Sequence, residues 1–335
     1  MPPPVTMRTV AAAAGVHQTT VSLALRNHPR IPAATRERIR RLAQTLGYRV
    51  NPLVAALSAS RRRRGKMIQA TLGYVTAGPG LPDTYGDLLA GVRARAEELG
   101  YGVDHLRLGE AHLTPSRFLR ITEARGIHGL IIAPLEHKTR SLHLDWSRFA
   151  TVAYGYSLQE PDLHRVTPDF YHGMNELLVR ARSAGFKRPG LVLDANTDRK
   201  ADHFWLSAFL TAQHLAPARL RIAPLRMTRW NPTEFTRWLR AEKPDALIGL
   251  GTMLDRITAS QTTARAPALP QFTLNASADD PRSGNRIDRT IAGATCVDLV
   301  VGMLHRNERD IPRHAHNLLV KTTWHEGVNA PPGHR

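Results

Sequence analysis

Two polar residues, Gln18 and Thr19, stand at the first turn of a predicted helix over residues 18–25, and their chemistry suits the edges of DNA bases. A glutamine amide can pair with adenine through two hydrogen bonds, and a threonine methyl group can contact the thymine methyl group. Leu23 follows one turn later on the same helical face and offers only apolar contact. We predict that Gln18, Thr19 and Leu23 read bases in a major groove. The alternative for the two polar residues is ordinary exposed helix surface.

Polar and basic side chains around this turn are of the kinds that hold phosphates, which position a protein on DNA without selecting sequence. The predicted phosphate contacts are Thr6, His17, Thr20, Ser22, Arg26, Arg30 and Asn51. The alternative interpretation of this set is a solvated basic face. His17 also occupies the N-cap position of the helix, where a short oxygen-bearing side chain is favoured.

The positive charge of the chain is concentrated at the same end. The net charge is +18, and residues 1–66 contain 13 Lys and Arg against one acid, Glu37, which gives +12. The other 269 residues contain 33 basic and 27 acidic residues, which gives +6. A polyanion is therefore expected to bind at the N-terminal end.

Three short helices separated by turn residues are predicted to position the polar turn. They cover about residues 10–14, 18–25 and 33–46, with Gly15 and Asn27-His28-Pro29 as the breaks between them. Their apolar positions fit one shared core, formed by Val10, Val16, Val21, Leu25, Ile39, Leu42, Ala43 and Leu46.

Beyond residue 66, short apolar segments alternate with amphipathic ones, a pattern typical of parallel sheets with helices on both faces. The predicted strands are Thr71–Val75, Leu130–Ala133, Thr151–Tyr154, Leu191–Leu193, Ala246–Leu250 and Phe272–Leu274. The predicted helices are Asp87–Leu99, Ser116–Ala124, Met174–Ser183, His203–His214, Pro232–Arg240 and Ala294–His305. About ten such units in 270 residues favour two lobes over one large sheet.

The N-terminal segment resembles the lactose/galactose-repressor (LacI/GalR) family. The resemblance runs from Val5 to Ile31 through Val10-Ala-Ala-Ala-Ala-Gly-Val and Thr20-Val-Ser, then through Thr35-Arg-Glu-Arg, Leu46-Gly-Tyr and Asn51-Pro-Leu-Val-Ala-Ala-Leu57. Looser matches follow at Gly91–Tyr101, Gly126–Ile132, Lys243–Ile248 and Asp298–Pro312. The resemblance implies a helix-turn-helix headpiece and a two-lobed, periplasmic-binding-protein-like effector domain.

The resemblance also implies a domain organisation. Residues 1–50 are expected to form the helix-turn-helix domain, 51–66 a hinge helix and basic linker, and 67–335 the effector and dimerisation domain. Lobe 1 is expected to cover about 67–161 and 291–320, and lobe 2 about 162–290 and 321–335.

In the family, the hinge segment folds on DNA and inserts leucines into the minor groove. That role falls here on Leu57, beside Val54, and an apolar wedge of this kind kinks the duplex. The alternative is that Leu57 packs in a linker helix. Asn51 and the run Arg61–Arg64 are expected to add backbone contacts, although the arginines also fit a solvated linker.

Sugar-binding members of the family bracket ligand hydroxyls with an arginine, an aspartate and an Asn-Asp pair. Those places correspond here to Trp205, Ala276 and Gly251-Thr252, so a common sugar is not expected as the effector. The sequence instead suggests an apolar or aromatic ligand stacked on Trp205, with Tyr85 and Asn275 orienting it. The alternatives are that Trp205 is a core residue and that no effector exists.

Other classes of function lack their sequence signals. We find no phosphate-binding Gly-rich loop, no Gly-x-Ser-x-Gly and no His-Glu-x-x-His, so neither enzymatic activity nor a cofactor is expected. His314-x-His316 is interpreted as a loop and not as a metal site, and the single cysteine, Cys296, as a small buried residue. No apolar run is long enough to span a membrane, and no signal peptide is seen, so a cytoplasmic location is expected.

The sequence thus predicts a DNA-binding transcription regulator, most simply a repressor, that binds a pseudopalindromic operator as a homodimer and responds to a small molecule. An architectural DNA-binding protein without a sensing role is the alternative. An extracytoplasmic solute-binding protein would share the two lobes but would have no use for residues 1–66.

Overall fold

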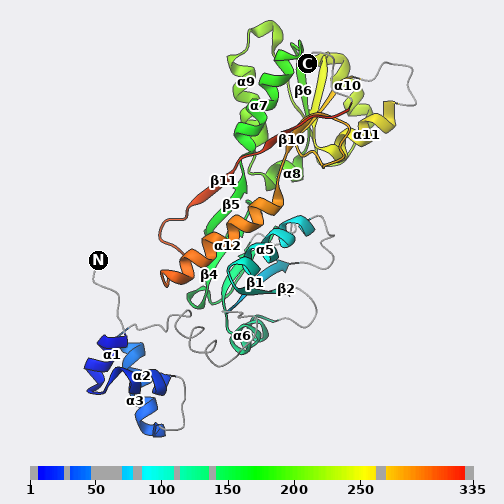
Figure 1. The fold of residues 1–335 in the computed structure, drawn as a ribbon. Helices are drawn as coiled ribbons and strands as arrows, with labels where there is room; N and C mark the ends of the chain where they lie inside the picture. Colours follow the sequence, from blue (N-terminus) through cyan, green and yellow to red (C-terminus); the bar gives the residue numbers. More distant parts are fainter. Residues whose placement is uncertain are drawn as a thin grey trace.

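The computed structural model describes residues 7–25, 31–46, 70–77, 85–108, 114–135, 141–261 and 269–328. These residues form a small three-helix N-terminal domain and two α/β lobes (Figure 1). Each part has its own cluster of buried apolar side chains, and the first lobe has one on each face of its sheet. The predicted fold class is confirmed.

The N-terminal domain consists of α1 (Met7–Ala14), α2 (Gln18–Leu25) and α3 (Ala33–Thr45). All three helices lie where the sequence predicts them. Val10, Val21 and Ile39, one from each helix, have no exposed surface and hold the domain together. They are part of a core of seven buried apolar side chains, and a domain of this size buries little surface beyond such a core.

The first lobe is built on a parallel six-stranded sheet in the order β11-β5-β4-β3-β1-β2. Its strands are β1 (Ala70–Ala77), β2 (Tyr101–Leu108), β3 (Ile127–Ile132), β4 (Ala150–Tyr154), β5 (His164–Pro168) and β11 (Asn317–Val320). Helices α5 (Gly86–Glu98) and α12 (Arg289–His305) cover one face, and α6 (Pro115–Ala124) covers the other. Such two-sided cover explains why β3 and β4 are almost continuously apolar.

The second lobe has a six-stranded sheet in the order β12-β10-β9-β8-β6-β7, parallel except for the β10–β12 pair. Its strands are β6 (Pro189–Asp194), β7 (Leu225–Met227), β8 (Ala246–Gly249), β9 (Gln271–Thr273), β10 (Gly284–Arg286) and β12 (Thr323–His325). Figure 1 shows α7 (Phe170–Ser183) and α9 (Phe204–Leu215) on one side of this sheet, and α10 (Pro232–Glu242) and α11 (Gly251–Gln261) on the other. The short helix α8 (Ala195–Lys200) follows β6 directly.

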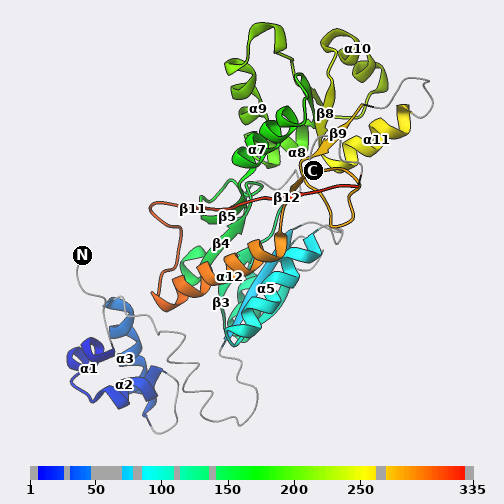
Figure 2. The ribbon, with the colours of Figure 1, turned by 45° about the horizontal axis from the view of Figure 1, so that its top comes forward.

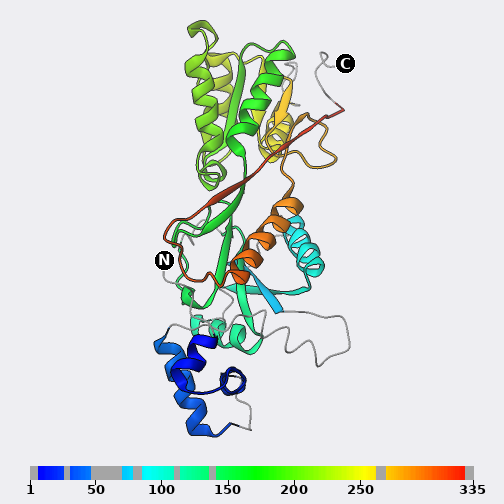
Figure 3. The same cartoon turned by 60° about the vertical axis from the view of Figure 1, so that its left-hand side comes forward.

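The chain passes between the lobes three times, after β5, after β10 and after β11 (Figures 2 and 3). The expected boundary near residue 161 is too early, because β5 pairs with β4 and β11 in the first sheet up to Pro168. Arg165, which interrupts the apolar pattern of β5, is buried and donates to the carbonyl oxygens of Gly155 and Leu158. A buried arginine is tolerated when hydrogen bonds satisfy its guanidinium. Its presence in β5 interrupts the apolar pattern from which a buried strand is predicted.

Helices α5 and α12 cross at two glycines, which allow their backbones to touch. A Cβ atom at Gly91 would overlap the Thr290 carbonyl oxygen, and one at Gly293 would overlap the Leu88 carbonyl oxygen. The close approach places the start of α12 beside the start of α5. This packing determines where Arg289, the first residue of α12, lies.

The predicted strands and helices beyond residue 66 are all present, with shifted ends. The strands and α-helices that were not predicted are β2, β5, β7, β10, β11, β12, α8 and α11. Most are three- to six-residue segments, too short for periodicity to identify. The short strands among them become regular because neighbouring strands supply their hydrogen bonds.

Candidate functional site

The turn between α1 and α2 has helix-turn-helix geometry built on Gly15. Gly15 has a φ of +64°, and its N–H donates to Ala12 O at 3.2 Å, while Val16 N–H donates to Ala11 O at 3.1 Å. A positive φ is the usual conformation of a glycine just beyond a helix end. The tight turn brings Val16 back onto the shared core and directs the start of α2 to the surface.

Three consecutive side chains are exposed at the start of α2: His17, Gln18 and Thr19. The Nδ1 atom of His17 lies 2.9 Å from Thr19 Oγ1 and 3.4 Å from the Thr19 backbone nitrogen. The imidazole thus caps the helix in place of a short oxygen-bearing side chain. It also holds the Thr19 hydroxyl, which leaves the methyl group and the Gln18 amide as the outward contacts.

Some of the other predicted DNA contacts lie within the described residues, and the rest lie outside them. Thr20 and Leu23 are half-buried, and Ser22 lies within α2. Leu23 therefore packs partly against its own domain and offers only part of its surface to a groove. Thr6, Arg26, Arg30, Asn51, Val54 and Leu57, with the whole expected hinge, lie outside the described residues.

The described residues of this domain are strongly basic. They contain Arg8 and four arginines of α3, against the single acid Glu37. Glu37 and Arg41 form an exposed pair 3.7 Å apart, which contributes little stability. Arg38 instead donates to Ala14 O at 3.2 Å and so caps the end of α1. The exposed polar start of α2 thus belongs to a domain whose third helix is basic.

A cavity of about 290 Å³ lies between the two lobes, at the carboxyl ends of strands from both sheets. Ligands of open α/β folds usually bind at this edge. The structure brings Tyr85, Trp205 and Asn275, distant in sequence, into its wall. The full lining is Tyr85, Pro134, Tyr154, Gly155, Tyr156, Ser157, Pro168, Phe170, Thr197, Lys200, Ala201, Trp205, Leu250, Thr252, Asn275, Ile287 and Arg289.

The three predicted effector residues are held in different ways. Trp205 is only 4% exposed and packs edge-to-face on Phe170, with ring centroids 4.6 Å apart, so it is a core residue with one edge in the cavity. Asn275 Oδ1 accepts from Gly251 N–H at 3.0 Å. No described residue accepts a hydrogen bond from Asn275 Nδ2. Tyr85 lies beneath the Arg289 guanidinium, 5.6 Å from ring centroid to Cζ.

Several cavity residues were not predicted: Tyr154, Tyr156, Phe170, Lys200 and Arg289. Tyr154 ends a predicted strand, and the rule that ligands bind at strand ends would have identified it. Burial raises the pKa of Tyr154 and of Tyr85, and the charge of Arg289 opposes that rise at both hydroxyls. Arg289 could not be found from its neighbours in sequence, because the α5–α12 crossing brings it there.

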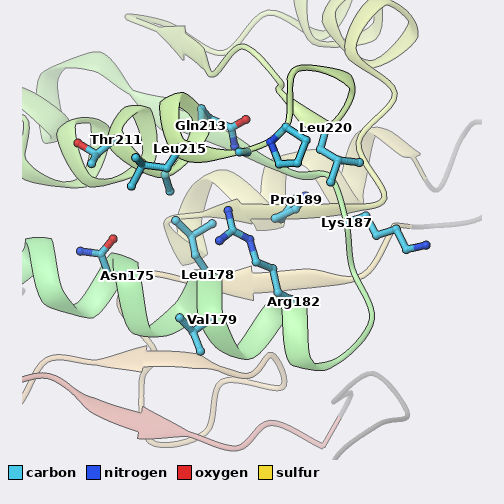
Figure 4. Close-up of a pocket in the computed structure, with 13 residues that line it drawn as sticks. Asn175, Leu178, Val179, Arg182, Lys187, Pro189, Thr211, Gln213, Leu215 and Leu220 are labelled. Carbon is cyan, nitrogen blue, oxygen red and sulfur yellow. The ribbon is translucent and has the colours of Figure 1, made fainter.

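A second hollow, of about 430 Å³, lies at the far end of α7 and α9 from the cavity (Figure 4). Asn175, Val179 and Arg182 of α7 and Thr211 and Leu215 of α9 line it. Val179 and Leu215 are 60% and 78% exposed. It is a surface groove of the second lobe alone, whereas the interlobe cavity is lined by both lobes.

Three further features concern the histidine loop, the cysteine and the helices of the described residues. Among the described residues there is no cluster of three or more potential metal ligands, and His316 of the predicted loop stacks on His164. Cys296 is fully buried in the first lobe, as predicted, and burial raises the pKa of its thiol. Within the described part of the chain, no helix combines the length and apolar character that crossing a membrane requires.

Comparisons with known proteins agree with this description. Residues 6–51 match the family model "Bacterial regulatory proteins, lacI family". The HTH-type transcriptional regulator RafR of Escherichia coli is 31% identical over 152 residues, which cover 44% of this chain and 43% of RafR. The chain thus matches less than half the length of that relative.

Solved structures extend the likeness in fold to the whole chain. A lac repressor dimer bound to operator and the anti-inducer ONPF has a TM-score of 0.55 at 18% identity, with 97% of this chain and 98% of that one covered. The CelR–cellobiose complex has a TM-score of 0.53 at 18% identity, with 97% and 100% covered. A periplasmic binding protein/LacI regulator from Alkaliphilus metalliredigens, complexed with D-xylulofuranose, has 0.55 at 9%, with 76% and 97% covered.

These features define a class: a helix-turn-helix domain joined to a two-lobed, periplasmic-binding-protein-like domain. Residues 6–51 match the lacI family model of bacterial regulatory proteins, and the two lobes have the fold of the solved lac repressor and CelR structures.

Proposed function

We propose that this protein is a sequence-specific, DNA-binding transcription regulator that binds a pseudopalindromic operator as a homodimer. The observation that carries the proposal is the exposed start of α2, where Gln18 and Thr19 project from a lacI-family domain of strongly positive charge. Helices of this motif place those positions in the major groove. Two copies related by a twofold axis read two half-sites, which accounts for the expected symmetry of the operator.

The proposal assigns a role to each part of the chain. Residues 1–50 read DNA, 51–66 form the hinge and basic linker, and the rest dimerises and senses. The base-reading residues are Gln18, Thr19 and Leu23, and Leu57 with Val54 enters the minor groove. Thr6, His17, Thr20, Ser22, Arg26, Arg30 and Asn51 hold phosphates.

Regulation is proposed to come from a small molecule in the interlobe cavity. The cavity is lined by both lobes, so a ligand there makes contacts that change when the lobes rotate. Rotation of the lobes would move the two hinge segments of the dimer apart or bring them together. Repression is the simplest outcome, because a bound dimer obstructs polymerase. This role needs neither catalysis nor a cofactor, and it places the protein in the cytoplasm with the DNA.

The proposal is tested by selecting random duplexes with the purified full-length protein at near-physiological salt, where phosphate attraction alone gives weak binding. We expect enrichment of an inverted repeat. Gln18→Ala should weaken binding to it by about 1–3 kcal/mol and relax one position of each half-site. Gln44→Ala, a matched change on the exposed side of α3, should leave it unchanged.

Recovery of DNA without an enriched sequence would contradict the proposal and would favour the architectural alternative. Loss of selection by Leu57→Gly, with non-specific binding retained, would support the hinge assignment.

A further inference from the structure

The interlobe cavity contains two cations and, among its lining residues, no acid. Lys200 comes from α8 in the second lobe, and Arg289 begins α12 in the first. Both are half-buried, and neither forms an ion pair with a described residue. A half-buried cation without a counter-charge keeps part of its hydration and can gain a charge-assisted hydrogen bond from an anion.

The acidic residues that adjoin α8 and the start of α12 in the sequence have other partners or face elsewhere. Asp194 accepts from Thr197 N–H at 2.8 Å, and buried Asp198 contacts His203 at 2.7 Å and Arg226 at 3.4 Å. Asp288 accepts from Ile291 N–H at 3.0 Å as the N-cap of α12. Asp202 is exposed and lines a different depression. An external anion is therefore the group that would complete the cavity.

The rest of the wall is aromatic and apolar. Five rings line the cavity, those of Tyr85, Tyr154, Tyr156, Phe170 and Trp205. Aromatic walls favour a flat ring that can stack or lie edge-to-face. The volume of about 290 Å³ suits a ligand of one or two small rings.

We propose that the ligand of the interlobe cavity is a small aromatic carboxylate, whose ring lies among the aromatic side chains and whose carboxylate is neutralised by Arg289 and Lys200. The planar guanidinium of Arg289 matches a carboxylate geometrically, and Asn275 Nδ2 is a further donor. Because the two cations belong to different lobes, an anion between them offsets their repulsion and favours closure. This inference rests on the proposed function, since it names the ligand class of its sensing site.

The test is calorimetric titration of the full-length protein with benzoate and 4-hydroxycinnamate, with benzamide as a neutral aromatic, acetate as a non-aromatic anion and cellobiose as a sugar. We expect both aromatic carboxylates to bind, and the other three to bind at least tenfold more weakly, because each lacks the charge, the ring or both. Equal binding of benzamide, preference for cellobiose, or no binding of either carboxylate at millimolar concentration would overturn the proposal.

Variants locate the site. Arg289→Gln and Lys200→Gln, from opposite lobes, should each weaken carboxylate binding roughly tenfold to a hundredfold. Arg289→Lys should restore part of the affinity. Arg182→Gln removes a cation from the surface groove of Figure 4 and serves as the matched control with unchanged affinity. Weakening by Arg182→Gln as large as that by Arg289→Gln would show only a loss of general charge attraction and would overturn the assignment.

Duplex selection with the same preparation, without any probe, separates this inference from the proposed function. Selection of an operator without carboxylate binding would overturn the inference alone. Carboxylate binding without operator selection would leave the ligand class standing and remove its regulatory role.

Discussion

Several single side chains in this protein make contacts that their residue types alone do not predict. His17 caps α2 where a small oxygen-bearing residue is usual, and in doing so it orients Thr19. Arg165 is buried within a strand because three acceptors surround it, two carbonyl oxygens and the Asp162 carboxylate. His164, its neighbour, accepts the His316 N–H through Nδ1 at 3.0 Å and stacks on the His316 ring. That acceptor requires an unprotonated Nδ1.

The His164 contact leads to a pH prediction. Burial, and then the charge of His316, lower the pKa of His164 below its ordinary value. The unfolded chain therefore binds the proton more readily, so this contribution to stability is present above about pH 6.5 and is lost as the pH falls below it. We expect His164→Gln, whose amide oxygen can still accept the N–H, to show a smaller loss of Tm between pH 7.5 and 5.5. Thermal melts at both pH values provide the measurement, and an equal loss in both proteins would contradict the prediction.

At the level of secondary structure, helices α5 and α12 pack backbone against backbone, and this contact has a consequence for the cavity. Gly91 and Gly293 permit the contact, and the contact places Arg289 above Tyr85. A distant backbone contact thus positions a cavity residue. Close helix approach through small residues leaves little room for relaxation, because interiors are packed to crystal-like density.

Substitution of two glycines of α12, Gly293 and Gly302, tests this constraint. Gly293→Ala should lower the stability of the first lobe by about 1–3 kcal/mol, since the new methyl group overlaps the backbone of α5. Gly302→Ala, on the same helix, is the matched control: its Cβ would meet only the flexible Arg306 side chain at 3.2 Å. Alanine favours a helix over glycine by about 1 kcal/mol, so the control should be neutral or stabilising. Urea unfolding measures both, and equal effects would refute the packing argument.

The whole molecule is divided into separate cores. The core of the N-terminal domain shares no residue with those of the lobes. Separate cores allow separate unfolding, so one cooperative transition is not expected for the full chain. Such independence suits a protein in which the proposed sensing and DNA-reading parts communicate only through the segment between them.

Removal of a buried side chain from one core should show that the N-terminal domain and the lobes unfold independently. Ile39→Ala removes a fully buried side chain of α3 and should destabilise the N-terminal domain by about 2–5 kcal/mol. Hydrogen exchange should accelerate in α1, α2 and α3, while the main calorimetric transition of the lobes keeps its Tm. A shift of the main transition by the same variant would mean that the domains unfold as one unit.

Much of this arrangement was predictable from the sequence. The three N-terminal helices, the concentration of charge and the strand–helix alternation depend on local periodicity, on turn residues such as Gly15, and on composition. Tyr85, Trp205 and Asn275 were proposed together only through resemblance to a family.

The tertiary structure alone decided the features that depend on contacts between residues far apart in the sequence. Short strands such as β10 and β12 are stabilised by partners far along the chain, so no local pattern marks them. The cavity joins side chains from both lobes, and the tertiary structure alone brought Arg289 and Lys200, from opposite lobes, into a lining that contains no acidic residue. Local propensities act over a few residues, whereas a binding site is assembled by packing.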